Sequence, residues 1–308
     1  MGLTDVKING CGYEAEFSSR LGATCYRLTY APLGCDVLRT PTSEADLEIN
    51  PYLYGNPILF PCNRISGGEF VFDGRKYGFP INEPKTNCHI HGALYSTPFK
   101  VINLAADEVA FRYDAEKNEY LGFPHAFSVV REYTADKTGL VEETTFINRS
   151  DEKMPLTLAF HTTFNAPFSG KGKCFATVPV VCEQLRDENC LPTGEWGSGK
   201  REEQMRRGEY EIGKVHLSAL YKIDKPDCFL ATDCVVVKYS ASPEYGYRMT
   251  YAEKDGGFMV IEPQTAAIDC FHLPEPPEKH GLIAINPREK LTLVTVIGVQ
   301  TRRNCRLG

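Results

Sequence analysis

The sequence predicts a large all-β fold, an antiparallel β-sandwich built from many short strands. Segments rich in β-branched and aromatic residues recur at about the 8–12-residue spacing that is typical of sandwiches and barrels. Helix-compatible segments are scarce in the 308 residues, and strands and helices do not alternate, which argues against a doubly wound α/β fold. Since no linker or internal repeat divides the chain, we expect a single domain over residues 1–308.

The first quarter of the chain contains short strands that glycine residues interrupt. We expect strands at residues 14–17, 22–30 and 34–39. Residues 40–56 are the best candidate for a short helix or an irregular loop. Asp73-Gly74 lies between two alternating segments, and Asp-Gly is a strong signal for a two-residue hairpin turn. This pattern predicts paired strands at residues 69–72 and 76–79.

The remaining chain continues the same rhythm with one interruption. Evenly spaced strands are expected at residues 99–104, 108–113, 126–133, 139–148 and 154–164. The stretch 183–213 is rich in Arg, Glu and Gly and breaks the rhythm, with a helix-compatible piece at residues 200–207. The last third returns to strands at residues 234–241, 247–252, 258–261 and 291–299.

Charge and cysteine usage exclude several classes of protein. The net charge of −6 argues against nucleic acid as a partner. No apolar run approaches the ~20 residues that a membrane span needs, so we expect no membrane partner. The N-terminal residues lack the basic and apolar regions of a secretory signal, and we expect a cytoplasmic protein. The 12 cysteines form no Cys-x-x-Cys pair, which favours free, mostly buried thiols.

Residues 57–95 combine a short apolar strand with an unusual density of polar side chains. Asn63 and Arg64 follow the apolar run directly, and the segment closes on His89 and His91. Two imidazoles separated by one residue would point the same way on a regular strand. The segment is therefore either an exposed hairpin with polar decoration or part of a binding site.

The order and spacing of residues in this segment resemble the signature of the aldose 1-epimerase (galactose mutarotase) family. The resemblance rests on Leu59-Phe60-Pro61, Asn63-Arg64-Ile65, Gly68, Phe70, Gly74, Tyr77, Asn82 and His91-Gly92. It implies a broad β-sandwich of many strands, often called a supersandwich. It also implies an isomerase that interconverts the α and β anomers of a hexose such as galactose or glucose, with a monosaccharide as its partner and without a cofactor.

Two later segments contain candidates for acid–base chemistry. On a regular strand, His161 would project from the smaller, more polar face, although a satisfied core histidine is the alternative interpretation. Glu262 follows the apolar run 258–261, so we expect it at a strand end, either solvated or held at a site. Desolvation there would raise its pKa toward the range of a general base. Both segments resemble family motifs, and the resemblance assigns Glu262 as the base and His161 as the acid.

The resemblance also assigns residues that bind the sugar. Arg64 and His91 would hold sugar hydroxyl groups, with Asn63 beside them. The family places a further aspartate on a loop before a phenylalanine, and Asp227 is preferred over Asp224 for this position. An aspartate in such a turn can instead cap backbone amides.

Three alternative functions are weighed against the epimerase. A His-x-His pair resembles the start of a cupin metal site, but residues 92–100 contain no glutamate, so no metal is expected. A non-catalytic sugar-binding protein could use the same fold, but it would not need an acid–base pair. A hexose-phosphate mutarotase would need basic residues at the rim, for which Arg201, Arg206 and Arg207 are candidates, although a solvated charged loop is the simpler interpretation. The sequence does not indicate the oligomeric state.

Overall fold

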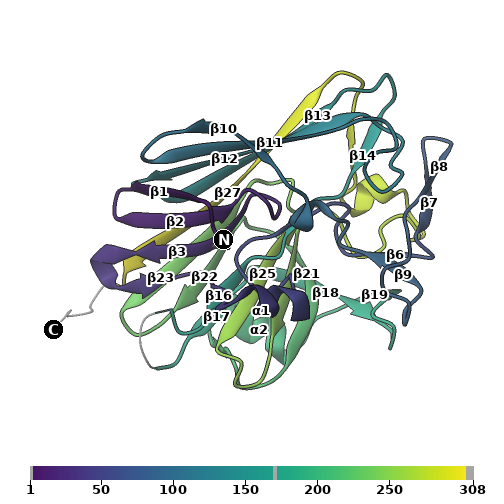
Figure 1. Ribbon diagram of the computed structural model, residues 1–308. Helices are drawn as coiled ribbons and strands as arrows, with labels where there is room; N and C mark the ends of the chain where they lie inside the picture. Colours follow the sequence, from purple (N-terminus) through teal and green to yellow (C-terminus); the bar gives the residue numbers. More distant parts are fainter. Residues whose placement is uncertain (1–2, 169–171, 303–308) are drawn as a thin grey trace.

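The computed structural model describes residues 3–168 and 172–302 of the chain. These residues form an almost entirely β structure in which the large sheets are built from antiparallel pairs, and the predicted fold class is confirmed (Figure 1). None of the helices in this part of the chain is long and apolar enough to cross a membrane.

The largest sheet has nine strands and is formed by the middle and the last third of the chain. Across the sheet they are β10 (Lys100–Leu104), β11 (Glu108–Ala115), β12 (Phe127–Asp136), β13 (Gly139–Asn148), β27 (Lys290–Thr301), β23 (Val235–Ala241), β22 (Asp227–Ala231), β17 (Phe175–Thr177) and β20 (Tyr210–Glu211).

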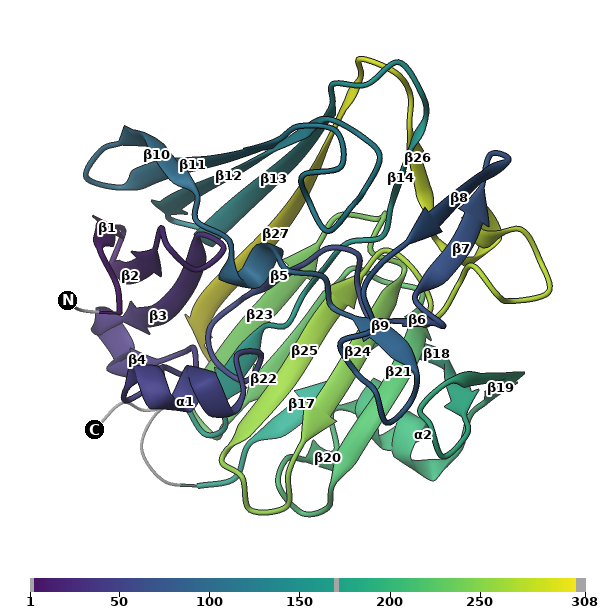
Figure 2. The same ribbon diagram turned by 45° about the vertical axis from the view of Figure 1, so that its right-hand side comes forward.

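A second large sheet has eight strands and carries most of the candidate site. Its order is β19 (Pro192–Gly197), β18 (Val180–Arg186), β21 (Leu217–Ile223), β24 (Tyr247–Ala252), β25 (Phe258–Gln264), β15 (Ala159–Phe160) and β5 (Ile58–Leu59). β16 (Thr163–Asn165) also pairs with β25, as β15 does. Figure 2 shows the neighbouring strands β25, β24 and β21 of this sheet side by side.

Smaller elements complete the structure. A four-stranded sheet contains β1 (Val6–Gly10), β2 (Tyr13–Ser18), β3 (Thr24–Tyr30) and β4 (Cys35–Asp36). Three strand pairs are β6 (Arg64–Ser66) with β9 (Cys88–Ile90), β7 (Glu69–Phe72) with β8 (Arg75–Gly78), and β14 (Met154–Leu156) with β26 (Ile283–Ile285). The helices are α1 (Glu44–Ile49) and α2 (Lys200–Arg207), and 3-10 turns lie at Ala31–Leu33, Leu94–Ser96 and Pro277–His280.

The two large sheets pack against each other around a large hydrophobic core. The buried cluster includes residues from Ile8 near the start of the chain to Val299 on its last strand. Between the sheets, the Thr162 and Tyr239 hydroxyl oxygens lie 2.8 Å apart, and the Phe164 and Tyr239 ring centroids lie 5.3 Å apart. The segment that carries His161 is therefore fixed from behind by the nine-stranded sheet.

Local signals in the sequence identified several elements correctly. The hairpin at Asp73-Gly74 is present as β7 and β8, and α1 lies within residues 40–56. The predicted helix at residues 200–207 is α2, which ends at Gly208 with a φ of 70°. Acidic residues in its first turn and basic residues in its last turn complement the helix dipole.

Other predictions of strands and thiols are corrected. The single strand expected at 154–164 is three short strands, because its segments pair with different partners. β14 pairs with β26, whereas β15 and β16 pair with β25. The stretch 183–213 was expected to interrupt the series of strands, but it contains most of the β18–β19 hairpin. β1, β21 and β22 were not predicted. Ten cysteines in the described part of the chain are free, but Cys234 is disulfide-bonded, so the expectation of free thiols throughout is wrong.

A buried ion pair joins two strands of the nine-stranded sheet to Asn56, which precedes the segment that carries Asn63 and Arg64. Arg131 on β12 and Glu142 on β13 are at most 2% exposed, and the Arg131 Nη2 and Glu142 Oε1 atoms are 2.7 Å apart. Asn56 joins them: its Nδ2 donates to Glu142 Oε2 at 2.8 Å, and its carbonyl accepts from Arg131. Every charge in this network has a partner, as buried charges require.

Glu142→Gln should lower the free energy of unfolding by about 3–5 kcal/mol, because it leaves the Arg131 guanidinium buried without a counter-charge. Urea denaturation measures this loss. Glu143→Gln on the same strand is the matched control and should change stability by less than about 0.5 kcal/mol, since Glu143 is exposed. Equal stability of Glu142→Gln and the unmodified protein would show that the ion pair does not hold these strands together.

Candidate active site

A pocket of about 220 Å³ brings together residues that are far apart in the sequence. Asn63, Arg64, His91, His161 and Glu262, five of the six predicted site residues, all line it. The pocket is lined by residues of β24 and β25 of the eight-stranded sheet and by residues of the β6–β9 pair. The sequence did not predict a further set of lining residues: Tyr52, Arg186, Cys190, Ser218, Met249 and Tyr251.

Glu262 lies in the middle of β25, and not at a strand end as expected. It is opposite Met249 on β24, and its side chain is completely buried. Oε1 accepts a hydrogen bond from Gln264 Nε2, two residues along the same strand face, whereas Oε2 has no hydrogen-bond partner among the described residues. Burial raises the pKa of the Glu262 carboxyl from 4.5 to about 8.

His161 lies in the short break between β15 and β16, so it is not part of the regular strand that the sequence suggested. Its backbone N–H donates to the Pro57 carbonyl at 3.0 Å, which holds the residue beside β5. Its Nε2 atom is 3.8 Å from Glu262 Oε2. Burial lowers the pKa of the His161 imidazole from 6.5 to about 4.

The opposite pKa shifts define the charge state of this pair. Below about pH 4 both groups hold a proton, and above about pH 8 neither does. Between these limits His161 and Glu262 together hold one proton, and burial favours its position on Glu262. The pair titrates as a unit, and the imidazolium–carboxylate form contains the same single proton. It can therefore exchange one proton with each of two atoms of a ligand.

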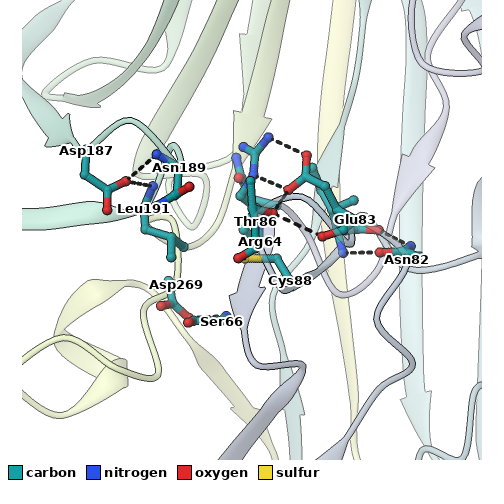
Figure 3. A network of polar contacts seen from close by, with 12 residues as sticks. Arg64, Ser66, Asn82, Glu83, Thr86, Cys88, Asp187, Asn189, Leu191 and Asp269 are labelled. Atoms are coloured by element: carbon teal, nitrogen blue, oxygen red, sulfur yellow. Dashed lines mark hydrogen bonds and ion pairs between the residues drawn. The ribbon is translucent and has the colours of Figure 1, made fainter.

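Arg64 enters the pocket from β6, and its charge is already compensated. Nε and Nη2 donate to the two carboxylate oxygens of Glu83 at 2.7 and 2.8 Å, a bidentate pair (Figure 3). Thr86 also donates to Glu83, and Asn82 exchanges two hydrogen bonds with the Ile90 backbone. These hydrogen bonds fix the loop between β8 and β9, and this loop in turn holds the Arg64 side chain.

The turns on either side of this β6–β9 pair determine where the other polar groups lie. Asn63 and His91 both adopt left-handed conformations, with φ of 56° and 63°. The His91 N–H donates to the Asn63 carbonyl at 3.1 Å. The next residue, Gly92, approaches Phe60 so closely that a Cβ atom would lie 1.7 Å from its carbonyl oxygen. A glycine is required here, and it allows the chain to aim His91 at the pocket.

The left-handed conformation of His91 overturns the expectation that the two histidines share one face. The His89 ring stacks on Phe79 with centroids 4.9 Å apart, and its Nδ1 is 2.7 Å from the Pro80 carbonyl oxygen. The His91 ring instead packs edge-on against His161, with centroids 5.8 Å apart. Within residues 3–168 and 172–302, no three His, Cys, Asp or Glu side chains are arranged to hold a metal ion.

Tyr52 is a site residue that the sequence did not indicate, because it lies in the irregular loop after α1. Its ring centroid is 4.8 Å from that of His91 and 5.9 Å from that of His161. The loop is fixed by the Gly55 carbonyl, which accepts from the Thr163 N–H at 2.8 Å. Tyr52 therefore forms an aromatic wall beside both histidines.

The structure does not bring Asp227 or Asp224 into this pocket. Asp227 is the first residue of β22 in the nine-stranded sheet. Asp227 and Asp224 both line a different pocket. Its carboxylate accepts from Ser240 Oγ at 2.6 Å and pairs with Lys238 Nζ at 2.8 Å. Because neighbouring side chains occupy this carboxylate and it lies on another sheet, we leave Asp227 out of the proposed site.

The basic residues considered for a phosphate-binding rim are also elsewhere. Arg201 pairs with Glu183 and Glu202, and Arg207 pairs with Glu203. Arg206 donates to the Val180 carbonyl at 3.1 Å. All three lie on α2, and none of them lines the pocket.

Comparisons with known proteins identify the family of the chain. A family model described as aldose 1-epimerase matches residues 6–254. Galactose mutarotase of Rattus norvegicus is 26% identical over 154 residues, which span 49% of this chain and 44% of the rat protein, so the match covers less than half of either chain.

Solved structures extend the likeness to almost the whole chain. A galactose mutarotase-like protein from Clostridium acetobutylicum superposes with a TM-score of 0.89 at 26% identity, covering 96% of this chain and 95% of that one. A galactose mutarotase-like protein from Lactobacillus casei has a TM-score of 0.71 at 16% identity, covering 96% and 99%, and supports the fold alone. Since the family model spans most of the sequence, the chain belongs to the aldose 1-epimerase family.

Proposed function

We propose that the protein is an aldose 1-epimerase that interconverts the anomers of a hexose. The observation that carries this proposal is the His161–Glu262 pair, whose Nε2 and Oε2 atoms lie 3.8 Å apart in the pocket. The volume of about 220 Å³ is below the ~300–1,000 Å³ that is usual for drug-sized ligands, and it suits a monosaccharide. The galactose mutarotase named among the relatives supports the same reaction class.

The reaction needs one base and one acid that act on two oxygens of the same carbon. Glu262 Oε2 takes the proton of the C1 hydroxyl while the C1–O5 bond breaks and its electron pair moves to the ring oxygen. His161, as imidazolium, gives its proton to that oxygen. The open-chain aldehyde rotates about the C1–C2 bond, and the two groups then reverse their roles to close the ring on the other face.

The protonation preference of the pocket suits this sequence of steps. Ring opening leaves Glu262 protonated and His161 neutral, which is the state that burial favours for both groups. Burial therefore favours the neutral pair that accompanies the opened sugar over the imidazolium–carboxylate pair with which the reaction begins. No electron transfer occurs, and every proton that moves returns, so the chemistry calls for no cofactor.

The surrounding side chains would position the sugar. Arg64 has one nitrogen, Nη1, that does not bond to Glu83 and could donate to a sugar oxygen. His91 has a buried Nδ1 without a hydrogen-bond partner among the described residues, and it is a second polar group available to the ligand. Asn63 lines the same wall, and Tyr52 offers an aromatic face to the ring.

Two broader assignments accompany this function. The continuous core from Ile8 to Val299 supports one domain over residues 1–308. The predominance of free thiols supports work in the cytoplasm, with the disulfide at Cys234 as the exception.

Glu262→Gln should reduce mutarotation by at least about 10³-fold while the sugar still binds, because the amide keeps the shape of the side chain but cannot take a proton. Polarimetry of a freshly dissolved hexose measures the rate, and calorimetry measures the affinity. His161→Asn should behave similarly, and the double variant should be little worse than either single one, since residues that act as a unit are not additive.

Arg64→Ala separates binding from proton transfer, since it should weaken affinity as well as turnover. A Glu262→Gln protein with near-normal turnover would rule out the epimerase proposal. Failure of the unmodified protein to accelerate mutarotation of any aldose, with binding retained, would favour the non-catalytic sugar-binding alternative.

The pH dependence of kcat/KM should be bell-shaped, with limbs near pH 4 and pH 8. Below the lower limb Glu262 and His161 are both protonated, and no base remains. Above the upper limb both are deprotonated, and no acid remains. Polarimetry over this range, with the spontaneous rate at each pH subtracted, tests the expectation. A rate that keeps rising well above pH 8 would show that the shared proton is not needed.

Glu262→Gln should also change stability, independently of activity. The raised pKa means that Glu262 is neutral in both folded and unfolded chains below about pH 4.5, and that the folded state is destabilised as pH rises from there through about 8. The variant should therefore be more stable than the unmodified protein by roughly 4 kcal/mol at high pH, and by little in acid.

Urea denaturation at both ends of this pH range measures the difference. Glu195→Gln is the control, since Glu195 is exposed and the same substitution there should not create a pH-dependent gain. A constant difference between Glu262→Gln and the unmodified protein across the range would contradict burial of a neutral carboxyl.

A further inference from the structure

We propose that the natural substrate is an aldose with a carboxylate group, a hexuronic acid, and that Arg186 is the residue that recognises this carboxylate. The inference requires a pocket that binds an aldose, so it rests on the proposed function and narrows its substrate class. Three features carry it: the uncompensated charge of Arg186, its rigid support, and its distance from Glu262.

Arg186 is the last residue of β18, and its place at the pocket is fixed by the turn that follows it. Asp187 Oδ1 accepts hydrogen bonds from the N–H groups of Asn189 and Leu191, both at 2.9 Å (Figure 3). The Asp187 N–H also donates to the Leu191 carbonyl at 2.9 Å. The acidic side chain next to Arg186 in the sequence is therefore used to close the turn.

The guanidinium of Arg186 has no counter-charge in the described part of the chain. Its Nη2 donates to the Ser218 carbonyl and, at 3.2 Å, to Ser218 Oγ, and it forms no ion pair with Asp or Glu there. Arg64 in the same pocket is compensated by Glu83. The wholly buried Arg248 donates through two nitrogens to three backbone carbonyls, whereas Arg186 bonds through one nitrogen and keeps the others available.

Partial burial of the charge of Arg186 is unfavourable. Desolvation lowers the pKa of its guanidinium, and the attraction of Glu183, which is paired with Arg201, is too weak to offset this. A bound oxyanion would supply the missing partner in the bidentate geometry that guanidinium and carboxylate groups favour.

The position of Arg186 matches the far end of a sugar whose C1 is at Glu262. Arg186 contacts Ser218 on β21, and β24 separates β21 from β25, which carries Glu262. Ser218 lies opposite Tyr251 on β24, whereas Glu262 lies opposite Met249. The two positions are therefore two strands and two residues apart, roughly 12 Å between their backbones, which leaves room for a pyranose with a hydrogen bond at each side. A carboxylate on C5 would lie in this direction, away from the reacting carbon.

Charge and volume favour a carboxylate over a phosphate. With Arg64 compensated by Glu83, the pocket offers one uncompensated positive charge, which matches a monoanion better than a phosphate dianion. The volume of about 220 Å³ is small for a sugar with an added phosphate arm. The arginines of α2, which could add positive charge at the rim, lie outside the pocket.

Mutarotation of galacturonic acid, galactose and galactose 6-phosphate at one ionic strength tests the assignment. The unmodified protein should have a kcat/KM for the uronic acid that is at least about 10-fold above that for galactose, because a hydrogen bond to a charged group is worth more than one to a hydroxyl. Arg186→Gln should lower kcat/KM for the uronic acid by about 10–100-fold, mainly through KM, and should lower it for galactose by a clearly smaller factor, so that the preference for the uronic acid is lost.

Arg206→Gln is the matched control, since Arg206 also donates to a backbone carbonyl but lies outside the pocket, and it should leave the preference unchanged. Arg186→Lys, which keeps the charge but loses the bidentate geometry, should retain part of the preference. If Arg186→Gln does not fold, the preference of the unmodified protein for the uronic acid still decides the question.

Each result separates this inference from the proposed function. Turnover of galactose without a preference for the uronic acid, or equal losses for both sugars in Arg186→Gln, would overturn the carboxylate assignment and leave the epimerase intact. A stronger Arg186-dependent preference for the phosphate would also overturn it. If no aldose is turned over, the epimerase proposal fails, and calorimetry with galacturonic acid decides the inference, since Arg186→Gln should then lose affinity relative to the unmodified protein.

Discussion

Desolvation of the Glu262 carboxyl is the constraint on which the site depends. β25 is buried along its whole length, and Glu262 lies at its centre with a single amide donor, Gln264, for its two oxygens. A carboxylate in such a place is unstable without further partners, so the group holds a proton at neutral pH. His161 is affected in the opposite direction by the same lack of water. Burial thus creates a pair that exchanges one proton, although neither residue is unusual by itself.

The position of His161 depends on a break in the sheet. A continuous strand from 154 to 164 would fix the histidine in a regular ladder, whereas the gap between β15 and β16 lets its backbone N–H bond to Pro57. Pro57 follows Asn56, whose amide and carbonyl belong to the buried Arg131–Glu142 network. The ion pair in the core and the acid–base pair in the pocket are therefore joined through one short backbone segment. Polar groups that stabilise the fold also hold the His161 imidazole in place.

The sequence predicted those features that local chemistry determines. The Asp73-Gly74 hairpin and α2 follow from turn and capping residues within a few positions, and both are present. It named His161 and Glu262 as candidates for acid–base chemistry, but it placed His161 on a regular strand and Glu262 at a strand end. The strand break at His161 and the position of Glu262 within β25 arise from pairing between distant segments. Tyr52 lies in a loop and Arg186 lies at the end of a strand, and no sequence motif marks either of them. Asp227 was misplaced because its strand joins the other sheet, which no short-range pattern reveals.

Under the proposed function, the two ends of the pocket have different tasks. The C1 end contains His161 and Glu262, and its chemistry is the same for every aldose because every aldose has the same hemiacetal carbon. Selection among sugars must therefore come from groups remote from C1, and the opposite end is formed by Arg186 and Ser218 on β18 and β21. Arg64 and Arg186 are the same type of residue, but Glu83 compensates only Arg64. Arg64 is therefore suited to neutral hydroxyl groups and Arg186 to an anion. Because Glu83 pairs with only one of the two arginines in the pocket, the two guanidinium groups differ in the ligand groups that they can bind.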